Sequence, residues 1–415
     1  MRLLAGVIEI DGKEKLLIIE DGVARLEPVE SQAQREEFGC YQLLKKRELH
    51  LRRGSVSGPG VFRFRYGPVT AGVREAGCFN LYTFGEKILH AGIDVSWKHR
   101  GIEETMSNKT PQRALALAEA VCSNFAFSHS VAYARAVENA LHSNVDMGVQ
   151  NWRNILLEAE RIYNHLHVIT KLASAAAQKV LTSHLSSLFE EALRLNEILT
   201  GSRYLMGINQ VGGFHHLPSL ENMQHAINGY SLIAKRFEQL YVHSVNNANY
   251  MDRLHAAGTI TADQAIAMGL SGPSLRACGV KDDLNTTISH LIQLPVITQN
   301  EGDALARMEV RAEEIMNSCE YIIDHLKISD AWNFNTDEAT KSIRENGEGC
   351  GIANSPSGAV AYYVVLQDGI IAHAQIFTPS YVGMHAAAFS LDEYIFTDFP
   401  FIFDSFGVHF SDAAR

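Results

Sequence analysis

Apolar side chains recur every three or four residues through the middle of the chain. Within residues 152–175 they include Ile155, Ile162 and Leu166, a spacing that places them on one face of a helix. Similar apolar spacing or helix-favouring composition is found at residues 179–199, 220–254 and 302–326. We therefore predict a bundle of long helices over residues 111–326, whose apolar stripes face one another.

Two further helices are expected within the same range of residues. Residues 114–141 contain few helix-breaking residues, so we expect a helix over this range. Thr261 is followed three residues later by Gln264, and this pair is typical of a capping box at a helix start. We expect that shorter helix to end near Gly269.

Both ends of the chain carry strand signals. Apolar runs at residues 7–10 and 16–19 flank an Asp-Gly turn, which predicts two strands joined by that turn. Residues 360–366 and 370–377 flank a Gln-Asp-Gly turn, which predicts a β-hairpin. The predicted fold class is therefore α+β, with a central long-helix bundle between small β-rich N-terminal and C-terminal parts.

This pattern divides the chain into two units. We expect a small β-rich segment over residues 1–60 and one large domain over residues 61–415. Within the large domain, the helical core of about residues 111–326 is followed by a hairpin-containing part at about residues 345–415. A chain of 415 residues is long enough to bury such a two-part core.

Composition and charge exclude several classes of protein. Apolar residues make up 46% and charged residues 20% of the chain, as in ordinary globular proteins. The formal net charge of −11 is opposite to the basic footprint of a nucleic-acid-binding protein, so we expect no nucleic-acid partner. No apolar stretch approaches a membrane span and no secretory signal opens the sequence, so we expect a cytoplasmic protein. The six cysteines form no CxxC pair, which favours free thiols over disulfides or an iron–sulfur cluster held by this chain alone.

Several short phrases stand in a fixed order from about residue 65 to the C-terminus. They are GPVTAG at 67–72, HRGIEE at 99–104, CSNFAFSHSVAY with VENA at 122–140, EILTGSR with GIN at 197–209, GEG with SPSG at 347–358, and TPSY at 378–381. Together they resemble the large subunit of membrane-bound, energy-converting (group 4) nickel–iron hydrogenases, including that of formate hydrogenlyase. The 49 kDa quinone-site subunit of respiratory complex I is a relative. One phrase would be a weak signal, but six in the right order are specific.

The resemblance implies a nickel–iron centre held by four thiolates from two CxxC pairs, because these soft metals require sulfur ligands. In this sequence the first pair consists of Cys122 and Phe125, so one thiolate is replaced by a benzyl ring. The second pair aligns with His409 and Asp412. Since three of the four ligands are missing, we expect that the chain binds no nickel–iron cofactor and turns over no hydrogen.

Other departures from the family pattern point the same way. Ser357 stands where the family has an arginine in its Ser-Pro-Ser-Gly phrase, and no arginine immediately precedes Cys122. Asn285 and Thr287 stand at a further family arginine and aspartate. These changes together indicate that the hydrogenase chemistry is gone.

The altered site leaves a different metal open as an alternative. Cys122, His409 and Asp412 form a mixed ligand set that can hold zinc or iron with one open position. The competing interpretation is a vestigial pocket that is filled by Phe125 and Phe410 and closed by hydrogen bonds. We favour the vestigial pocket and expect no metal in this chain.

Quinone binding is the other alternative that the resemblance implies. The complex I subunit uses a histidine in the opening phrase, where this chain has Thr70. It also uses a tyrosine after the HRGIE-like phrase, whereas residues 110–130 contain no tyrosine here. Quinone reduction by that chemistry is therefore not favoured.

Glu103 and His129 are the candidates for catalytic chemistry. The resemblance places the Glu103 carboxylate beside the active site as a proton relay, and the alternative is an ion pair of Arg100 with Glu103 or Glu104 that only orders the turn. His129 matches the family phrase, although a buried and satisfied histidine is the more common finding. Glu138 lies nine residues further along the predicted helix, on its opposite face, so we do not expect it to act beside His129.

Three functions of different classes follow from these observations. The first is a hydrogenase-related subunit of a membrane-associated respiratory or energy-converting complex, which couples electron transfer to ion translocation without nickel–iron. The second is a structural subunit with no chemistry of its own, and the third is a quinone- or other-metal-dependent oxidoreductase subunit. The resemblance implies as partners an iron–sulfur small subunit that holds the cluster, membrane-arm and antiporter-like subunits, and a complex I 30 kDa-like subunit. These partners would hold the chain at the inner face of the cell membrane.

Overall fold

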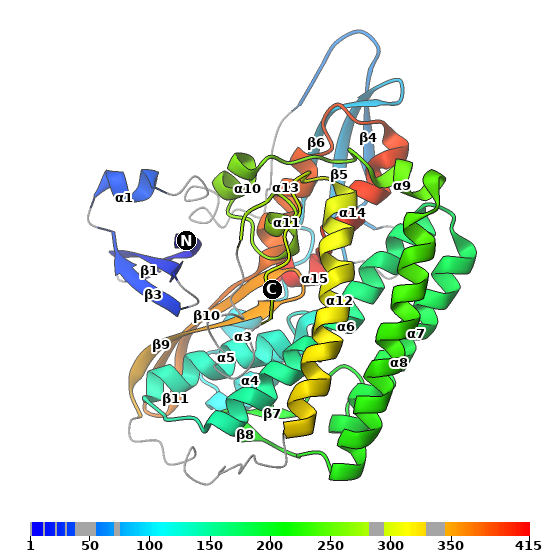
Figure 1. The fold of residues 1–415 in the computed structure, drawn as a ribbon. Coiled ribbons are helices and arrows are strands. Elements are labelled where there is room, and N and C mark those ends of the chain that lie inside the picture. Colours follow the sequence, from blue (N-terminus) through cyan, green and yellow to red (C-terminus); the bar gives the residue numbers. More distant parts are fainter. Residues whose placement is uncertain are drawn as a thin grey trace.

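The computed structural model describes residues 2–10, 13–20, 23–29, 31–37, 55–69, 75–281, 294–328 and 345–415. Long helices stand side by side on one side of the molecule, and small sheets cover the other side (Figure 1). The described residues contain three sheets of three strands each and one two-stranded ribbon. This arrangement confirms the predicted α+β class with a long-helix bundle beside smaller β-rich parts.

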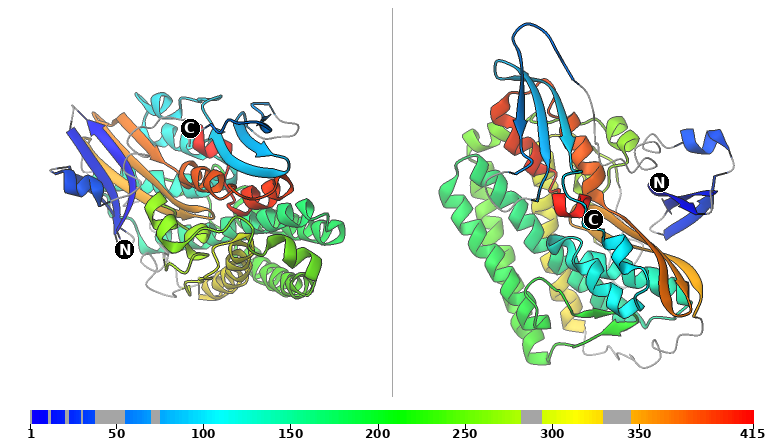
Figure 2. Two further views of the ribbon diagram at one scale, coloured as in Figure 1. Left: turned by 90° about the horizontal axis from the view of Figure 1, so that it is seen from above. Right: turned by 180° about the vertical axis from the view of Figure 1, so that it is seen from behind.

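Four long helices form the bundle, as the apolar spacing predicts. They are α6 (Met147–Ala175), α7 (Lys179–Thr200), α8 (Leu220–Val245) and α12 (Ala304–Ile328). Figure 2 shows them packed along one another from two further directions. Ile155, Ile162 and Leu166 of α6 are fully buried. Their spacing in the sequence therefore correctly predicts a face of α6 that packs inside the bundle.

Two predicted helix boundaries are set by side-chain caps. The helix expected over residues 220–254 ends at Val245, and a second helix, α9 (Ala248–Leu254), begins after Asn247. The Asn247 side chain accepts a hydrogen bond from the backbone of Tyr250, which satisfies one free N–H at this start. The Thr261 capping box is confirmed and opens α10 (Ala262–Met268).

The helix predicted over residues 114–141 is interrupted. It is observed as α4 (Pro111–Glu119), a short 3-10 turn (Ser123–Phe125) and α5 (Ala126–Leu141). The buried carboxylate of Glu160 accepts hydrogen bonds from the backbone N–H groups of Phe127 and Ser128. Because this interaction satisfies the first turn of α5 from outside, the chain begins a new helix there instead of continuing α4.

The C-terminal hairpin is also confirmed. Strands β9 (Gly347–Ser355), β10 (Gly358–Gln367) and β11 (Ile370–Phe377) form an antiparallel sheet in the order β11-β10-β9. Helix α5 lies directly against β9, where a Cβ atom on Gly349 would stand only 2.2 Å from the carbonyl oxygen of Ala136. Gly347 and Gly351 meet Ala140 and Ala132 in the same way, so only glycine permits this close approach.

The N-terminal strands pack onto this sheet. Strands β1 (Arg2–Ile10), β2 (Lys13–Glu20) and β3 (Val23–Pro28) are antiparallel neighbours and precede the short helix α1 (Gln32–Glu36). Ile8, Leu17 and Ile19 share one apolar cluster with Ile352 and Phe377. The two strand regions that the sequence predicts at opposite ends of the chain therefore lie side by side.

A third sheet packs against the aromatic C-terminal segment. It consists of β4 (Val61–Tyr66), β5 (Cys78–Phe84) and β6 (Lys87–Asp94). The ring of Phe79 contacts the rings of Phe399, Phe403 and Phe410 at centroid distances of 4.9 to 5.8 Å. These contacts place the rings of Phe399, Phe403 and Phe410 in the core.

The remaining elements are short apart from one helix at the C-terminal side. They are α3 (Ile102–Met106), β7 (Asn209–Gln210), β8 (Gly213–Phe214), α11 (Pro273–Arg276), α13 (Pro379–Phe389), α14 (Phe399–Ser405) and α15 (Phe410–Ala413). A second 3-10 turn spans Phe396–Asp398. In the part of the chain that the structure describes, no helix has the length and apolar character needed to cross a membrane.

Candidate functional site

The loop that carries Cys122 is fixed by Arg100. The Arg100 guanidinium donates hydrogen bonds to the carbonyl oxygens of Ala120, at 2.8 Å, and of Val121. It also donates to the carbonyl of Ser411, at 2.8 Å, from the C-terminal segment. Arg100 therefore joins the first cysteine phrase to the segment that aligns with the second one.

Cys122 is a buried thiol beside aromatic rings. Burial, followed by the negative charge of Asp412, raises the pKa of this thiol to about 12. The Ser411 hydroxyl donates to the Cys122 sulfur at 3.5 Å. The ring of Phe125 packs edge-on against the ring of His409, with 4.9 Å between centroids. At neutral pH this environment holds a protonated cysteine next to an apolar ring.

Asp412, His129 and Tyr362 form a buried row of hydrogen bonds. His129 Nε2 lies 2.9 Å from Asp412 Oδ1, and His129 Nδ1 lies 2.9 Å from the Tyr362 hydroxyl oxygen. All three side chains are fully buried. A carboxylate only accepts, so His129 Nε2 donates to Asp412, and in the neutral imidazole Nδ1 then accepts from Tyr362. The second Asp412 oxygen accepts from the backbone of Ser380 at 3.2 Å.

Charges near this row set its protonation. Burial alone would raise the pKa of Asp412, but the hydrogen bonds that it accepts from His129 and Ser380 help to outweigh burial and lower it. Burial raises the pKa of Tyr362 well above its usual value, and the negative charges of Asp412 and Glu103 raise it further. The row therefore contains an ionised carboxylate at one end and a neutral phenol at the other, with Glu103 close enough to act on the phenol.

Glu103 has different partners from those considered as the alternative. Its Oε1 atom accepts a hydrogen bond from the backbone of Ile376 at 2.7 Å and lies 3.5 Å from Arg415 Nε. Glu104 lies 3.5 Å from His99, whereas Arg100 binds the three carbonyls described above. The suggested pairing of Arg100 with Glu103 or Glu104 is therefore wrong, because Arg100 points toward the cysteine loop.

Glu138 and His129 have separate partners, as their helical spacing predicts. The Glu138 carboxylate pairs with the buried Arg153 at 2.6 Å and accepts from the backbone of Gly212 at 2.7 Å. The structure thus joins His129 to Asp412 and Tyr362, and it joins Glu138 to a different region of the fold.

The three residues of the alternative metal site are neighbours but are used otherwise. Both Asp412 oxygens are engaged by His129 and Ser380. Within the described ranges, no group of three or more histidine, cysteine, aspartate or glutamate side chains has an arrangement that could hold a metal ion. The geometry gives no support to a site made of Cys122, His409 and Asp412.

A cavity of about 730 Å³ opens beside this region. One wall is the cysteine loop from Ala120 to Asn124 with Arg100, another is His167 and Lys171 of α6, and the rest comes from Tyr204 and the C-terminal segment up to Ser411. A volume of this size suits a small organic molecule. Ser411 lines this cavity and directly precedes Asp412 in the chain. The row of Asp412, His129 and Tyr362 therefore starts next to a residue of the cavity wall.

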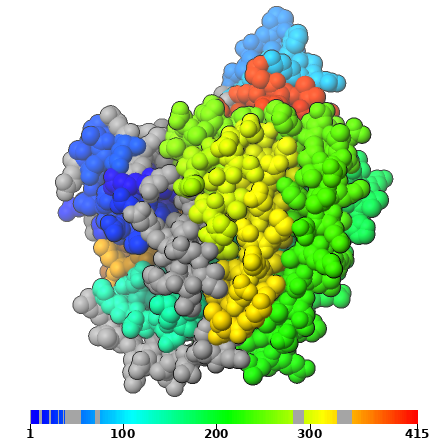
Figure 3. Space-filling view, viewed as in Figure 1, coloured from blue at the N-terminus to red at the C-terminus, as the bar shows by residue number. Residues whose placement is uncertain are grey.

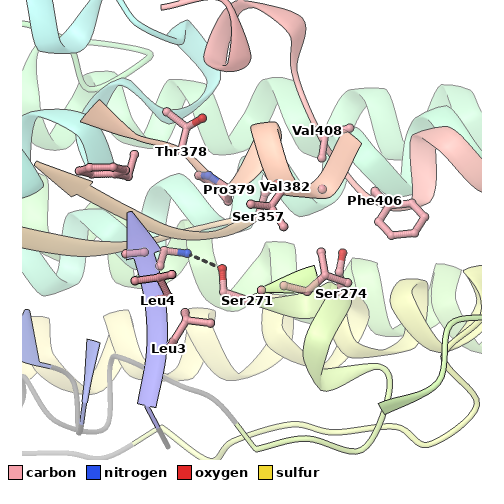
Figure 4. A pocket seen from close by; sticks show the side chains of 16 residues that line it. Leu3, Leu4, Ser271, Ser274, Ser357, Thr378, Pro379, Val382, Phe406 and Val408 are labelled. Atoms are coloured by element: carbon pink, nitrogen blue, oxygen red, sulfur yellow. Dashed lines mark hydrogen bonds between the residues drawn. The ribbon is translucent and has the colours of Figure 1, made fainter. Parts of the chain in front are cut away.

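Ser357 lies on the other side of the C-terminal segment. Its hydroxyl donates to the carbonyl of Gly407 at 2.6 Å, and Arg311 of α12 donates to the neighbouring carbonyl of Phe406 at 3.0 Å. Figure 4 shows Ser357 among the residues that line a small cavity of about 30 Å³. This space holds about one water molecule, and Thr378, which also lines it, has a buried hydroxyl without a hydrogen-bond partner in the described structure. At the position where we predict that the family arginine is lost, the Ser357 hydroxyl thus bonds to the backbone of Gly407 instead.

A buried charge cluster between α6 and α12 was not predicted. Glu314 contacts Arg276, His165 at 2.7 Å and Arg161 at 3.7 Å, and Arg161 lies 3.3 Å from Glu158. The charges of its partners hold the pKa of Glu314 well below its usual range despite burial. Charged residues at positions 158, 161 and 165 stand at helical spacing within an otherwise apolar stretch, and this signal could have revealed the cluster.

Comparisons with known proteins agree with this geometry. Residues 184–346 match the family described as respiratory-chain NADH dehydrogenase, 49 Kd subunit. Residues 100–174 match the nickel-dependent hydrogenase family. The two family models thus match adjoining parts of the chain, and both are groups that its six sequence phrases resemble.

Individual relatives are subunits of large enzymes. One subunit of the F(420)H(2) dehydrogenase of Methanosarcina mazei is 28% identical over 59% of this chain and 66% of its own length. Formate hydrogenlyase subunit 5 of Escherichia coli is 28% identical over 63% of this chain and 47% of its own length. One subunit of the NADH-quinone oxidoreductase of Roseiflexus castenholzii is 30% identical over 56% of this chain and 57% of its own length. The chain thus spans about half to two thirds of the length of these relatives.

A solved structure shares the fold. A chain from the membrane-bound sulfane sulfur reductase, an archaeal respiratory membrane complex, superimposes with a TM-score of 0.78. The match covers 87% of this chain and all of the other at 21% identity. At this identity the likeness establishes the fold alone.

Proposed function

We propose that this chain is a hydrogenase-related subunit of a membrane-associated respiratory complex, where it couples electron transfer to ion translocation without a nickel–iron centre. The observation that carries the proposal is the buried row of Asp412, His129 and Tyr362, which leads from the altered metal position toward Glu103. The names of the relatives, which include a dehydrogenase, a formate hydrogenlyase and a quinone oxidoreductase, support this class of assembly.

The residues present do not fit a nickel–iron centre. Such a centre carries out hydrogen chemistry when four thiolates hold it, two of which bridge the metals. The corresponding positions here offer one buried thiol, a phenyl ring, an imidazole that packs on this ring, and a carboxylate whose two oxygens are engaged. Cys122, the single thiol, favours its protonated form because burial raises its pKa to about 12. These groups therefore supply one sulfur atom where the cofactor needs four, and the remaining oxygen and nitrogen donors are too hard for nickel and iron in this centre.

The buried row can move a proton over its length without moving heavy atoms far. The Tyr362 hydroxyl donates to His129 Nδ1, and His129 Nε2–H donates to Asp412. When Asp412 takes the Nε2 proton and Nδ1 takes the phenol proton, the Tyr362 phenolate that results is reprotonated from outside the row, and Glu103, whose charge acts on Tyr362, is the acid that we propose for this step. This is general acid–base chemistry at fixed distances of 2.9 Å. Ser411, the neighbour of Asp412 in the chain, lines the cavity, so we propose that a change of charge in the cavity shifts the protons of the row.

Three substitutions test the coupling in the native complex. Asp412→Asn and Tyr362→Phe preserve side-chain shape but break the row, and Glu103→Gln alters its far end. Each should leave subunit assembly and electron transfer in place while ion translocation into proteoliposomes falls by roughly tenfold or more. Asp324→Asn, at an exposed pair with Lys327, is the matched control and should translocate normally. Normal translocation in all three variants would instead support a structural subunit with no chemistry of its own.

The assembly around the chain is part of the proposal. It comprises an iron–sulfur small subunit that holds the cluster, membrane-arm and antiporter-like subunits, and a complex I 30 kDa-like subunit. These partners hold the chain at the inner face of the cell membrane. The matches to the two family models and the respiratory-complex relatives support this composition. Purification of the tagged chain from its own host, followed by identification of stoichiometric subunits, tests it.

The large cavity supports a second candidate function, the binding of a redox-active small molecule such as a quinone. Its walls combine Tyr204, Phe403 and Phe410 with the polar groups of Arg100 and Lys171, a mixture typical of sites for flat, partly polar ligands. Displacement of a quinone analogue from the purified complex tests this function. Equal binding to wild type and to a Tyr204→Ala variant would argue against the cavity as the site.

A further inference from the structure

The sheet formed by β4, β5 and β6 stands out from the body of the protein at one end. Figure 3 shows this end projecting above the helices, next to residues of the C-terminal segment. β4 is an edge strand, since the sheet order is β4-β5-β6. Within the described residues no strand pairs with its other side, and the side chains of Arg63 and Arg65 on this strand are exposed.

The strand register defines which residues share the outer face. Arg63 lies opposite Tyr82, Arg65 lies opposite Asn80, and Val61 lies opposite Phe84. Directly paired residues point to the same side of a sheet. We call the surface made by Arg63, Arg65, Tyr82, Phe84 and the adjacent Trp97 the arginine–aromatic face.

The two arginines of this face have no carboxylate partner in the described structure. Arg63 donates to the amide oxygen of Asn80 at 2.7 Å, and Arg65 donates to the sulfur of Cys78 at 3.2 Å. The Arg65 guanidinium also lies over the Trp97 ring, 5.0 Å from its centroid. Both guanidinium groups therefore keep donors available for a carboxylate from another molecule.

Other cations around the same sheet are already paired. Lys98 binds Glu75 at 2.6 Å, and Lys87 binds Glu393. In a chain with a formal net charge of −11, two neighbouring arginines without such partners give this face a local positive charge. That charge would attract an acidic surface.

Exposed aromatic rings surround the arginines. Phe84 is 57% exposed and Trp97 is 48% exposed on the outer side, and Phe62 is 63% exposed on the opposite side of the same strand end. Aromatic residues and arginine are the side chains that most often dominate binding energy at protein interfaces. Large exposed rings beside unpaired guanidinium groups thus have the composition of an interface.

We propose that the arginine–aromatic face binds another protein subunit, which presents aspartate or glutamate side chains beside an apolar strip. The carboxylates bind Arg63 and Arg65, and the apolar strip covers Phe84 and Trp97. The proposal concerns assembly and is independent of the proton row, so either can fail without the other.

Site-specific cross-linking in the native complex identifies the occupant. The photoreactive residue p-benzoylphenylalanine is placed at Tyr82 or Phe84 in the full chain, expressed in its own host with its partners. The expected result is one cross-linked subunit, joined through a peptide that contains an aspartate or glutamate. Val180 of α7, which is 74% exposed, is the control position and should not give that product. No subunit product, or the same product from Val180, overturns the proposal.

Charge reversal then tests the carboxylate contact. The double variant Arg63→Glu/Arg65→Glu should lower the affinity for the cross-linked subunit by about tenfold or more. Reversal of the cross-linked acidic residue to arginine should restore it. Lys179→Glu/Lys235→Glu makes the same charge change at exposed positions of α7 and α8 and should have no effect. Unchanged affinity in the Arg63→Glu/Arg65→Glu variant, with an unaltered circular dichroism spectrum, overturns the proposal. So does a loss confined to binding of phosphatidylglycerol vesicles, which would assign the face to lipid.

Discussion

His129 Nε2 lies 2.9 Å from Asp412 Oδ1, and neither side chain is exposed to solvent. His129 comes from the first cysteine phrase, and Asp412 stands where the proposed alignment puts the family's last thiolate. The second Asp412 oxygen is held by the backbone of Ser380. Both carboxylate oxygens of Asp412 are therefore hydrogen-bonded within the chain. These bonds join the segment of His129 to the C-terminal segment without a metal ion.

Removal of the Asp412 carboxylate should destabilise the protein. Asp412→Ala leaves His129 Nε2 buried without an acceptor, so we expect a loss of about 3 kcal/mol in the free energy of unfolding at pH 7. Folding lowers the pKa of Asp412. The contribution of Asp412 to the free energy of unfolding is therefore fully present above its pKa in the unfolded chain, about 3.9. It is lost as the pH falls through the lowered pKa. Urea unfolding at neutral and acidic pH measures this difference, which should shrink in acid. The exposed Asp324→Ala variant is the control, and a loss that persists undiminished at the lowest pH would contradict the account.

Glu160 should have the opposite dependence on pH. Burial raises its pKa to about 8 in the folded state, so the folded protein binds more protons than the unfolded chain between that value and the unfolded value of about 4.3. Its contribution to stability therefore falls as the pH rises through this window, by up to about 1.4 kcal/mol per pH unit. Glu160→Gln should remove this slope, so that the stability of the variant relative to wild type increases from pH 5 to pH 8. Parallel stability profiles for the two proteins would disprove the assignment.

The contact between α5 and β9 should tolerate no side chain. A Cβ atom at Gly349 would lie 2.2 Å from Ala136 O and 2.4 Å from Ala140 N, so Gly349→Ala must push the helix off the sheet. We expect a loss of about 3 kcal/mol or more. Gly58→Ala, which meets only Val61 at 3.8 Å, should change stability by less than about 0.5 kcal/mol. Equal melting temperatures for these two variants would be inconsistent with the observed packing.

Cys122 should be chemically inert in the folded protein. It is buried, and its pKa is raised to about 12, so its thiolate fraction at pH 8 is roughly a thousandfold lower than that of a free cysteine. Iodoacetamide should modify it only after unfolding in urea, as peptide mapping by mass spectrometry can measure. Rapid labelling of Cys122 in the native protein would mean that the loop is open to solvent.

Much of the fold follows from local patterns in the sequence. The spacing of Ile155, Ile162 and Leu166 predicts the buried face of α6, and the Thr261–Gln264 pair predicts where α10 starts. These features depend on residues that are near one another in the chain. The interruption before α5 does not, because it is caused by Glu160, which lies more than thirty residues further on. Local helix propensity cannot register such a contact.

The site shows the same division. The resemblance places Glu103, His129 and Asp412 near one region, but it does not indicate that Tyr362 links them, because Tyr362 lies in a hairpin strand with no motif around it. The pairing of Glu103 with Arg415 was likewise missed, since 312 positions separate the two residues (415 − 103). Contacts of this kind depend on the three-dimensional packing of α5 against the C-terminal sheet.

The nickel content of the complex tests the central claim most directly. The chain, purified with its partners from its own host grown with nickel, should contain far less than one nickel per chain by plasma mass spectrometry. The reason is the proposed alignment, in which Phe125, His409 and Asp412 stand at three of the four thiolate positions of the family's centre. One nickel per chain, lost on Cys122→Ala, would contradict the account.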